Sequence, residues 1–216
     1  MITSLMTSIL NISHLLPQVI AQFGWLTYIG LFGIIFIETG LVLFPFLPGD
    51  SILFLCGSIA ALSNHPLNHI ILIIVLSIAA ILGDFVNFEI GQHLGKHLTG
   101  SNKWSKWIKP KYVKDAQSFF NRHGSSAIFL GRFVPIIRTF IPFTAGASKM
   151  QYRKFAIFNI LGAFSWVAVA VLAGFLFGNV SIVKAHFELI MVAIIIISLA
   201  PAVLMSVIQN KRNVGL

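Results

Sequence analysis

The sequence has little charge of either sign and very few acids. Of its 216 residues 10% are charged and six are acidic, whereas 57% are hydrophobic and the mean hydropathy is +0.90. Soluble domains carry about 25% charged residues, so this composition excludes a soluble globular protein. It indicates an integral membrane protein of one domain, residues 1–216. The single cysteine, Cys56, excludes an intrachain disulfide and is expected to be a small packing residue.

Positive charge is missing from the first 95 residues, and every Lys and Arg lies at or after Lys96. Without an early positive region, a cleaved signal peptide is not expected. Positive segments remain in the cytoplasm, so the basic, amphipathic segment 94–124 is expected at the cytoplasmic face. Lys211 and Arg212 place the C-terminus on the same side. Membrane orientation explains these basic residues, and nucleic acid is not an expected partner.

Long stretches have no Asp, Glu, Lys or Arg at all. Residues 51–83, 155–183 and 189–210 each exceed the ~20 residues that a helix needs to cross a bilayer. They predict transmembrane helices over 67–90, 154–177 and 189–210. Residues 1–24 are uncharged and are expected to form an interfacial or tilted helix.

Two further apolar segments, 25–63 and 125–148, are broken in the middle. Arms of about ten residues reach only ~15 Å, which is half a bilayer, so each segment is predicted to be a re-entrant helical hairpin. Full crossings are the alternative. The breaks contain Pro45, Pro48 and Gly49 in the first segment, and Gly131 and Pro135 in the second.

A hairpin followed by a transmembrane helix therefore occurs twice, in opposite orientations. Secondary transporters share this inverted-repeat plan and bind substrate near the midplane, between the broken segments. The predicted fold class is an all-α polytopic membrane protein with two inverted repeats and an extra C-terminal transmembrane helix. Glycines in the crossing helices also permit close packing in a homo-oligomer.

Four ionisable residues lie inside the two broken segments: Glu38, Asp50, Arg132 and Arg138. A charge at membrane depth costs roughly 2.5–3.5 kcal/mol, so four unpaired charges would cost about 10–14 kcal/mol. They must therefore meet one another, water or a charged substrate. We expect acids from one half and arginines from the other to converge in a membrane-embedded site, although the pattern does not fix which acid faces which arginine.

Three stretches make the sequence resemble the DedA membrane proteins, which are related to the VTT-domain or SNARE-associated Golgi proteins. They are FPFLPGDSILFLCGSIAA after Glu38, GDFVNFEIGQHLG from Gly83, and HGSSAIFLGRFVPIIRTFIPFTAGASKMQYRKF from His123, with Asn159, Gly162 and Trp166 beyond. The resemblance implies that the two acids and two arginines are required for function. It also implies transport of a lipid, most concretely undecaprenyl phosphate, across the bacterial inner membrane, coupled to protons in at least some members.

The residue types fit that implied activity. An arginine fork holds a phosphate through two parallel hydrogen bonds, so Arg132 and Arg138 are expected to bind the headgroup. Burial and a neighbouring arginine move the pKa of a carboxyl group in opposite directions, which suits proton exchange. We expect Glu38 to carry the proton and Asp50 to pair with an arginine.

Other residues are expected to support the site. Asp84 is expected to line the transport path, or to make polar contacts near Asn87. Thr139, at the end of the motif Gly131–Thr139, and Asn159, in the following helix, are also expected to support the site. The hairpin residues with the same expected role are Pro45, Pro48, Gly49, Gly131 and Pro135. The expected partners are an anionic lipid, protons and the membrane itself.

Three other interpretations stay open. The same acids suit a proton-coupled exchanger of small ions or drugs, and the four charges suit purely structural ion pairs. A lipid-phosphate enzyme needs a nucleophile or a metal near the arginines, and only Thr139, Thr144 and distant histidines are candidates.

His93 and His97 share a helix face and could be two ligands of a metal, but the sequence places no third ligand near them. We therefore expect no enzymatic activity, no cofactor and no metal.

Overall fold

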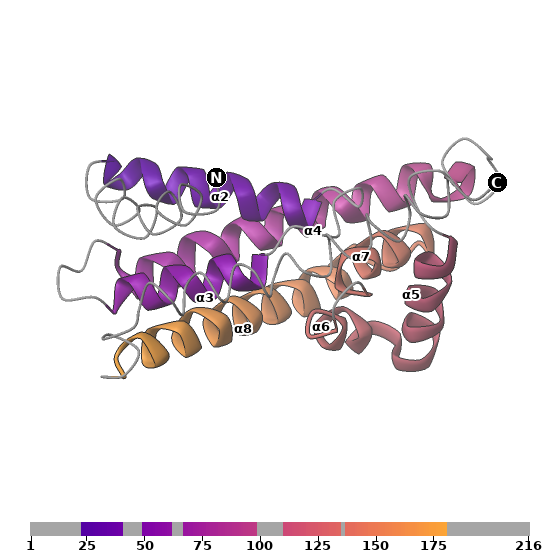
Figure 1. Cartoon of the computed structure of the whole chain (residues 1–216). Helices are drawn as coiled ribbons and strands as arrows, with labels where there is room; N and C mark the ends of the chain where they lie inside the picture. The colour runs from indigo at the N-terminus through magenta and orange to yellow at the C-terminus, as the bar shows by residue number, and fades with distance from the viewer. Residues whose placement is uncertain (1–22, 41–48, 62–66, 99–109, 135–136, 181–216) are drawn as a thin grey trace, which may run out of the picture. The chain divides into compact units, whose positions relative to one another are not determined.

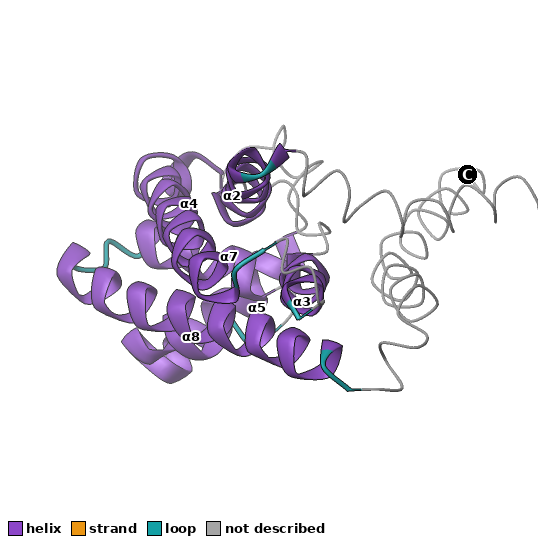
Figure 2. Cartoon of the chain, turned by 90° about the vertical axis from the view of Figure 1, so that its left-hand side faces the viewer, coloured by secondary structure: helices purple, strands orange, loops and turns teal. Residues whose placement is uncertain are grey.

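The computed structural model describes residues 23–40, 49–61, 67–98, 110–134 and 137–180. Within these ranges all regular structure is helical (Figures 1 and 2), which confirms the all-α prediction for this part of the chain. The elements are α2 Trp25–Gly40, α3 Gly49–Ala60, α4 His69–Leu98, α5 Pro110–His123, the 3₁₀ turn η1 Gly124–Ser126, α6 Ala127–Gly131, α7 Ile137–Ala147 and α8 Tyr152–Gly178. The predicted helix 189–210 and nearly all of segment 1–24 lie outside the described residues.

Two helices are long and apolar enough to cross a membrane, by length and composition. They span His69–His93, which is most of α4, and Tyr152–Gly178, which is α8. The Asn68 side chain begins α4, because its Oδ1 accepts hydrogen bonds from the backbone N–H groups of Ile70 and Ile71 at 2.8 and 3.2 Å. The helix then continues to Leu98, past the predicted end at residue 90, because no proline interrupts it.

Three of the four helices in the predicted hairpins are short, whereas α2, the first arm of the first hairpin, has 16 residues and is longer than the expected arm of about ten. α3 has 12 residues and α7 has 11, which at the helical rise is ~16–18 Å, well below the ~30 Å of a hydrocarbon core. α6 has 5 residues and packs on α7, where Gly131 faces the Ile141 side chain. The turn residues Pro45, Pro48 and Pro135 lie outside the described residues. Re-entrant hairpins and inverted repeats therefore stay predictions.

The chain divides into two compact units. The first contains Met1–Thr27, Pro48–Leu72 and Ala170–Leu216, and the second contains Tyr28–Leu47 and Ile73–Val169. In the first unit α3 packs on the last part of α8 at backbone contact. A Cβ at Gly57 would lie 2.1 Å from the Val171 carbonyl oxygen, and a Cβ at Gly174 would lie 2.0 Å from that of Phe54. These glycines allow the two backbones to approach this closely.

The second unit has the same packing motif between α4 and α7. A Cβ at Gly91 would lie 2.1 Å from the Phe143 carbonyl oxygen, and a Cβ at Gly146 would lie 2.1 Å from that of Phe88. The spacing is the same in both units. The glycine of one helix contacts a carbonyl oxygen of the other helix, and the glycine of that other helix lies three residues after this carbonyl. The contact fixes α7 on α4.

A hydrophobic core surrounds this contact in the second unit. The stacked rings of Phe88 and Phe155, with centroids 4.1 Å apart, join α4 to α8. The amphipathic α5 packs on α6 and α7, and Gly124, with φ +59°, follows its end. The core residues are Phe88, Ala127, Ile128, Ile141, Ala145 and Phe155. The core positions the loop after α6 and the first turn of α7, where the two arginines lie.

Candidate functional site

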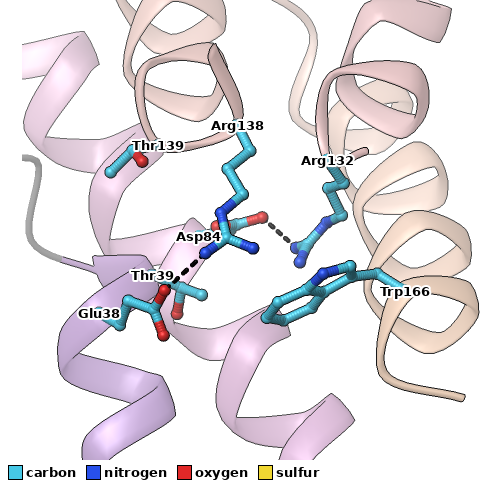
Figure 3. A pocket seen from close by; sticks show the side chains of 7 residues that line it. All are labelled: Glu38, Thr39, Asp84, Arg132, Arg138, Thr139 and Trp166. Carbon is cyan, nitrogen blue, oxygen red and sulfur yellow. Dashed lines mark hydrogen bonds and ion pairs between the residues drawn. The ribbon is translucent and has the colours of Figure 1, made fainter. Parts of the chain in front are cut away.

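A pocket lies within the second unit, and charged side chains from several helices line it (Figure 3). α2 and α4 contribute the acids, the residue after α6 and the first turn of α7 contribute the arginines, and α8 contributes an indole ring. The lining residues are Glu38, Thr39, Asp84, Arg132, Arg138, Thr139 and Trp166. Two cations and two anions are therefore collected in one largely apolar unit.

The first ion pair joins α7 to α2. Arg138 Nη2 donates to Glu38 Oε1 at 2.7 Å, across 100 positions of sequence. The Glu38 side chain is 7% exposed and that of Arg138 is 18% exposed. Because both charges are shielded from water, removing either one would leave the other as an uncompensated buried charge.

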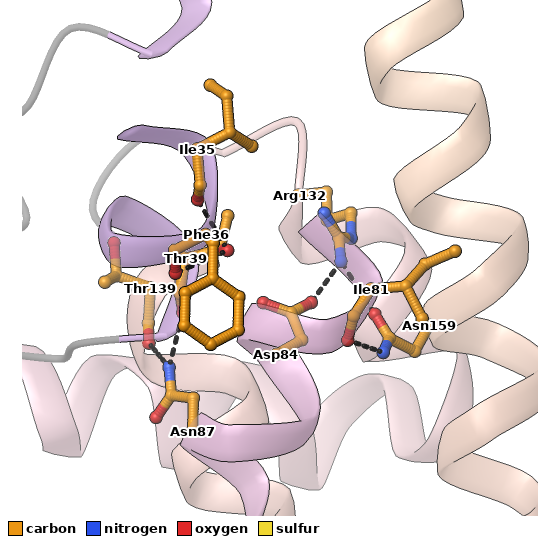
Figure 4. Close-up of polar contacts among 9 residues, drawn as sticks. All are labelled: Ile35, Phe36, Thr39, Ile81, Asp84, Asn87, Arg132, Thr139 and Asn159. Atoms are coloured by element: carbon orange, nitrogen blue, oxygen red, sulfur yellow. Dashed lines mark hydrogen bonds and ion pairs between the residues drawn. The ribbon is translucent and has the colours of Figure 1, made fainter. Parts of the chain in front are cut away.

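The second ion pair joins the end of α6 to α4. Arg132 Nη2 donates to Asp84 Oδ2, and both side chains are 6% exposed. The same nitrogen also donates to Asn159 Oδ1 at 2.7 Å, and Asn159 Nδ2 donates to the Ile81 carbonyl at 3.2 Å (Figure 4). The Nε atom of Arg132 is buried and has no hydrogen-bond partner. One donor of this guanidinium is therefore unsatisfied.

Trp166 brings the two cations to one surface. The Cζ atom of Arg138 lies 5.0 Å from the centre of the indole ring, and that of Arg132 lies 5.9 Å from it. Figure 3 shows both guanidinium groups next to this ring. A tryptophan face attracts cations, by about 0.5–2 kcal/mol. The indole thus holds two like charges near each other.

Hydrogen bonds from Asn87 connect the backbones beside the two ion pairs. Its Nδ2 atom donates to the Thr139 carbonyl at 2.8 Å and to the Thr39 carbonyl at 3.3 Å (Figure 4). These two carbonyls follow Arg138 and Glu38 directly in the sequence. α2 also lies against α4 at Gly83, where a Cβ would meet Thr39 Oγ1 at 2.0 Å. The backbone positions of the first ion pair are therefore set by α4.

The structure brings together Glu38, Arg132 and Arg138 of the four predicted charges, with Asp84 and Thr139. Asn159 contacts Arg132 directly. Asp50 is exposed in the first turn of α3, which belongs to the other unit, and its pairing with an arginine stays a prediction. Gly49 begins the same helix, and the predicted prolines lie outside the described residues.

Sequence reasoning gave no role to Thr39 or Trp166. Asn159, Gly162 and Trp166 follow one another at helical spacing on α8, so the sequence carried a signal of a shared face. Within the described residues no group of three His, Cys, Asp or Glu side chains is arranged to hold a metal ion.

The long apolar helices and the buried ion pairs define an integral membrane protein with a charged internal pocket. Residues 47–176 match the family model of the VTT domain. The chain is 44% identical to the protein DedA of Escherichia coli over 204 residues, which covers 94% of this chain and 92% of that protein. The chain belongs to the DedA family of membrane proteins, as its motifs predicted.

Two further relatives carry membrane names. An uncharacterized membrane protein of Mycobacterium tuberculosis, Rv0364, is 39% identical over 209 residues, or 92% of this chain and 91% of that protein. The inner membrane protein YghB of Escherichia coli is 34% identical over 173 residues, or 80% of this chain and 78% of that protein. No solved structure matches the chain.

The Trp166 contact leads to a prediction on anion binding. Trp166→Leu is expected to weaken binding of an anion such as inorganic phosphate about tenfold, because the two arginines lose the shared cation–π surface. Trp166→Phe keeps an aromatic face and is expected to lose less than half of that free energy. Titration calorimetry on the purified protein measures both. Equal losses in the two variants would show that the aromatic face is not what matters.

Proposed function

We propose that this protein is a membrane transporter that moves a lipid phosphate, most concretely undecaprenyl phosphate, across the bacterial inner membrane. The observation that carries the proposal is the pair of shielded arginines, Arg132 and Arg138, beside one indole ring in one pocket. Two cations held close together can bind a group that carries two negative charges.

The chemistry of the pocket supports a phosphate headgroup. Each guanidinium presents a planar fork that matches phosphate oxygens, and the two together balance a phosphate dianion. The pocket is small and is lined by seven residues, of which four are charged. It suits a headgroup, while the polyprenyl tail remains in the lipid.

Proton coupling follows from the ion pair of Glu38 with Arg138. In the structure the Glu38 carboxylate neutralises Arg138. When phosphate binds Arg138, Glu38 loses this cation, and the loss of a neighbouring cation favours the protonated form of a buried carboxyl group. A proton then accompanies the headgroup. We propose Glu38 as the proton carrier, and Asp50 stays a predicted second acid, tested by Asp50→Asn in the same assay.

Alternating access would come from the two repeats. The matching glycine contacts, α3 with α8 and α4 with α7, each join a helix of the first predicted repeat to a helix of the second, which supports a plan of two related repeats. In such transporters one half rocks against the other around a fixed central site. With the basic segments on the cytoplasmic side, the C-terminus would lie in the cytoplasm.

A lipid-transport assay in liposomes tests the proposal. Purified protein is reconstituted, and movement of a labelled polyprenyl phosphate between leaflets is followed with and without a pH gradient. We expect movement that the gradient accelerates. Movement of small cations or drugs without any movement of the lipid would instead support the exchanger, and release of inorganic phosphate would support an enzyme.

Glu38→Gln separates proton coupling from binding in this assay. The amide mimics the protonated acid, so this variant is expected to bind the lipid phosphate and to lose about 90% of the acceleration by the gradient, because no proton is exchanged at this position. Glu89→Gln is the matched control, since Glu89 is a half-exposed acid of α4 next to His93. A gradient response that survives in Glu38→Gln at the level of the control would exclude Glu38 as the carrier.

A further inference from the structure

We propose that Asp84 occupies Arg132 as an internal substitute for the ligand, and that the oxyanion of the headgroup displaces it. Asp84 would then be the acid that sets affinity at the second arginine. The inference rests on the proposed function for the nature of the ligand, and it assigns to Asp84 a competing role that the sequence did not indicate.

The geometry of Arg132 shows that Asp84 is an incomplete partner. The Nε and Nη2 atoms of a guanidinium form one edge, which a well-fitting oxyanion grips with two parallel hydrogen bonds. Here Asp84 and Asn159 both accept from Nη2, while Nε has no partner, although the side chain is 6% exposed. A buried donor without an acceptor is unfavourable. Arg132 therefore has one hydrogen bond of this edge unmade.

A phosphate group satisfies this edge better than Asp84 does. Its tetrahedral oxygens can accept from Nε and Nη2 together and direct another oxygen to Arg138, which lies at the same indole ring. Gly162 keeps this region open, because a Cβ there would lie 3.3 Å from Nε and 3.1 Å from Cδ of Arg132. The exchange of Asp84 for phosphate thus gains one charge-assisted hydrogen bond.

Asn159 keeps Arg132 in position during the exchange. It accepts from Nη2 at 2.7 Å, and its own amide is fixed by the Ile81 carbonyl. The amide is neutral, so it orients the arginine without competing for its charge. The charged groups that share the pocket with Asp84 are Glu38 from α2, and Arg132 and Arg138 from the segment of α6 and α7, while α8 contributes uncharged side chains there.

Equilibrium binding of farnesyl phosphate, a short prenyl monophosphate, tests the inference on the full chain in detergent. Asp84→Asn removes the competing charge and keeps the size of the side chain. It is expected to bind the probe at least about tenfold more tightly than the unmodified protein at neutral pH, because the binding-competent arginine no longer has to be released. Asp84→Glu keeps the competing charge on a longer side chain whose two oxygens could accept from Nε and Nη2 together, and it is expected to bind at least about tenfold more weakly. Glu89→Gln should bind as the unmodified protein does.

The outcomes separate this inference from the proposed function. If the unmodified protein binds the probe and Arg132→Gln abolishes binding, but Asp84→Asn binds no more tightly, Asp84 is a structural partner and the inference is wrong. If Asp84→Asn does not fold, Asp84→Glu decides: unchanged or tighter binding overturns the inference. If neither Arg132→Gln nor Arg138→Gln alters binding, the proposed function fails, and the role of Asp84 fails with it.

Discussion

Arg132→Gln and Arg138→Gln are each expected to reduce transport of polyprenyl phosphate at least about 100-fold. Removing one member of a buried, hydrogen-bonded charge pair costs about 2–5 kcal/mol, and about 2.7 kcal/mol corresponds to 100-fold. Each variant also leaves a carboxylate without its cation, either Asp84 or Glu38. The measurement is the initial rate of lipid movement in liposomes, normalised to folded protein.

Charge exchange separates function from structure at the same positions. The double variant Glu38→Arg with Arg138→Glu keeps an ion pair between α2 and α7. It is expected to unfold at a higher temperature than Arg138→Gln, because neither charge is left unpaired. It is also expected to be as inactive as the single variant, because the pocket then presents the second cation from α2 at the wrong place. Recovery of transport along with stability would show that the pair only joins the helices.

Gly146→Ala is expected to cause a large loss of stability. The new methyl group would lie 2.1 Å from the Phe88 carbonyl oxygen and 2.9 Å from the Gln92 backbone nitrogen, so α7 must move away from α4. Overpacking against backbone costs at least about 1–3 kcal/mol. Because α7 carries Arg138, transport should decrease as well. Thermal unfolding in detergent measures the first effect.

Gly30→Ala is the matched control for this prediction. Gly30 lies on α2 with nothing within 4 Å of the position of a new Cβ. Alanine is the better helix former by about 1 kcal/mol, so this variant is expected to unfold at the same temperature as the unmodified protein or slightly above it. A Gly146→Ala protein as stable as Gly30→Ala would contradict the close contact of α4 and α7.

The charges of the site were predictable because membrane depth makes charge expensive. Glu38, Arg132 and Arg138 stand out in apolar segments, and all three line the pocket. Which acid meets which arginine was not predictable, because the pairs join positions 100 and 48 residues apart. Those contacts depend on how α2 and α7 lie against α4, and glycine contacts with backbone atoms decide that arrangement.

Asp84 shows most clearly where sequence reasoning reached its limit. It lies on a long crossing helix, so hydropathy allowed it to line a path or to make local polar contacts. Arg132 donates to Asp84 and to Asn159, and Asn159 belongs to another helix, 75 positions from Asp84 in the sequence. Trp166 was missed for a related reason, since an aromatic residue in an apolar helix is typical of any lipid-facing or core position.

The central claim is that Arg132 and Arg138 hold one phosphate together. The most direct measurement is the magnetic dipolar coupling, by solid-state NMR, between phosphorus of bound farnesyl phosphate and ¹⁵N-labelled guanidinium nitrogens. With N–O hydrogen bonds of about 2.8 Å, the phosphorus must lie within about 4 Å of arginine nitrogens. The account predicts strong coupling that is reduced in each of Arg132→Gln and Arg138→Gln and absent in the double variant. Coupling that neither substitution changes, or bound phosphate without coupling to arginine, would contradict it.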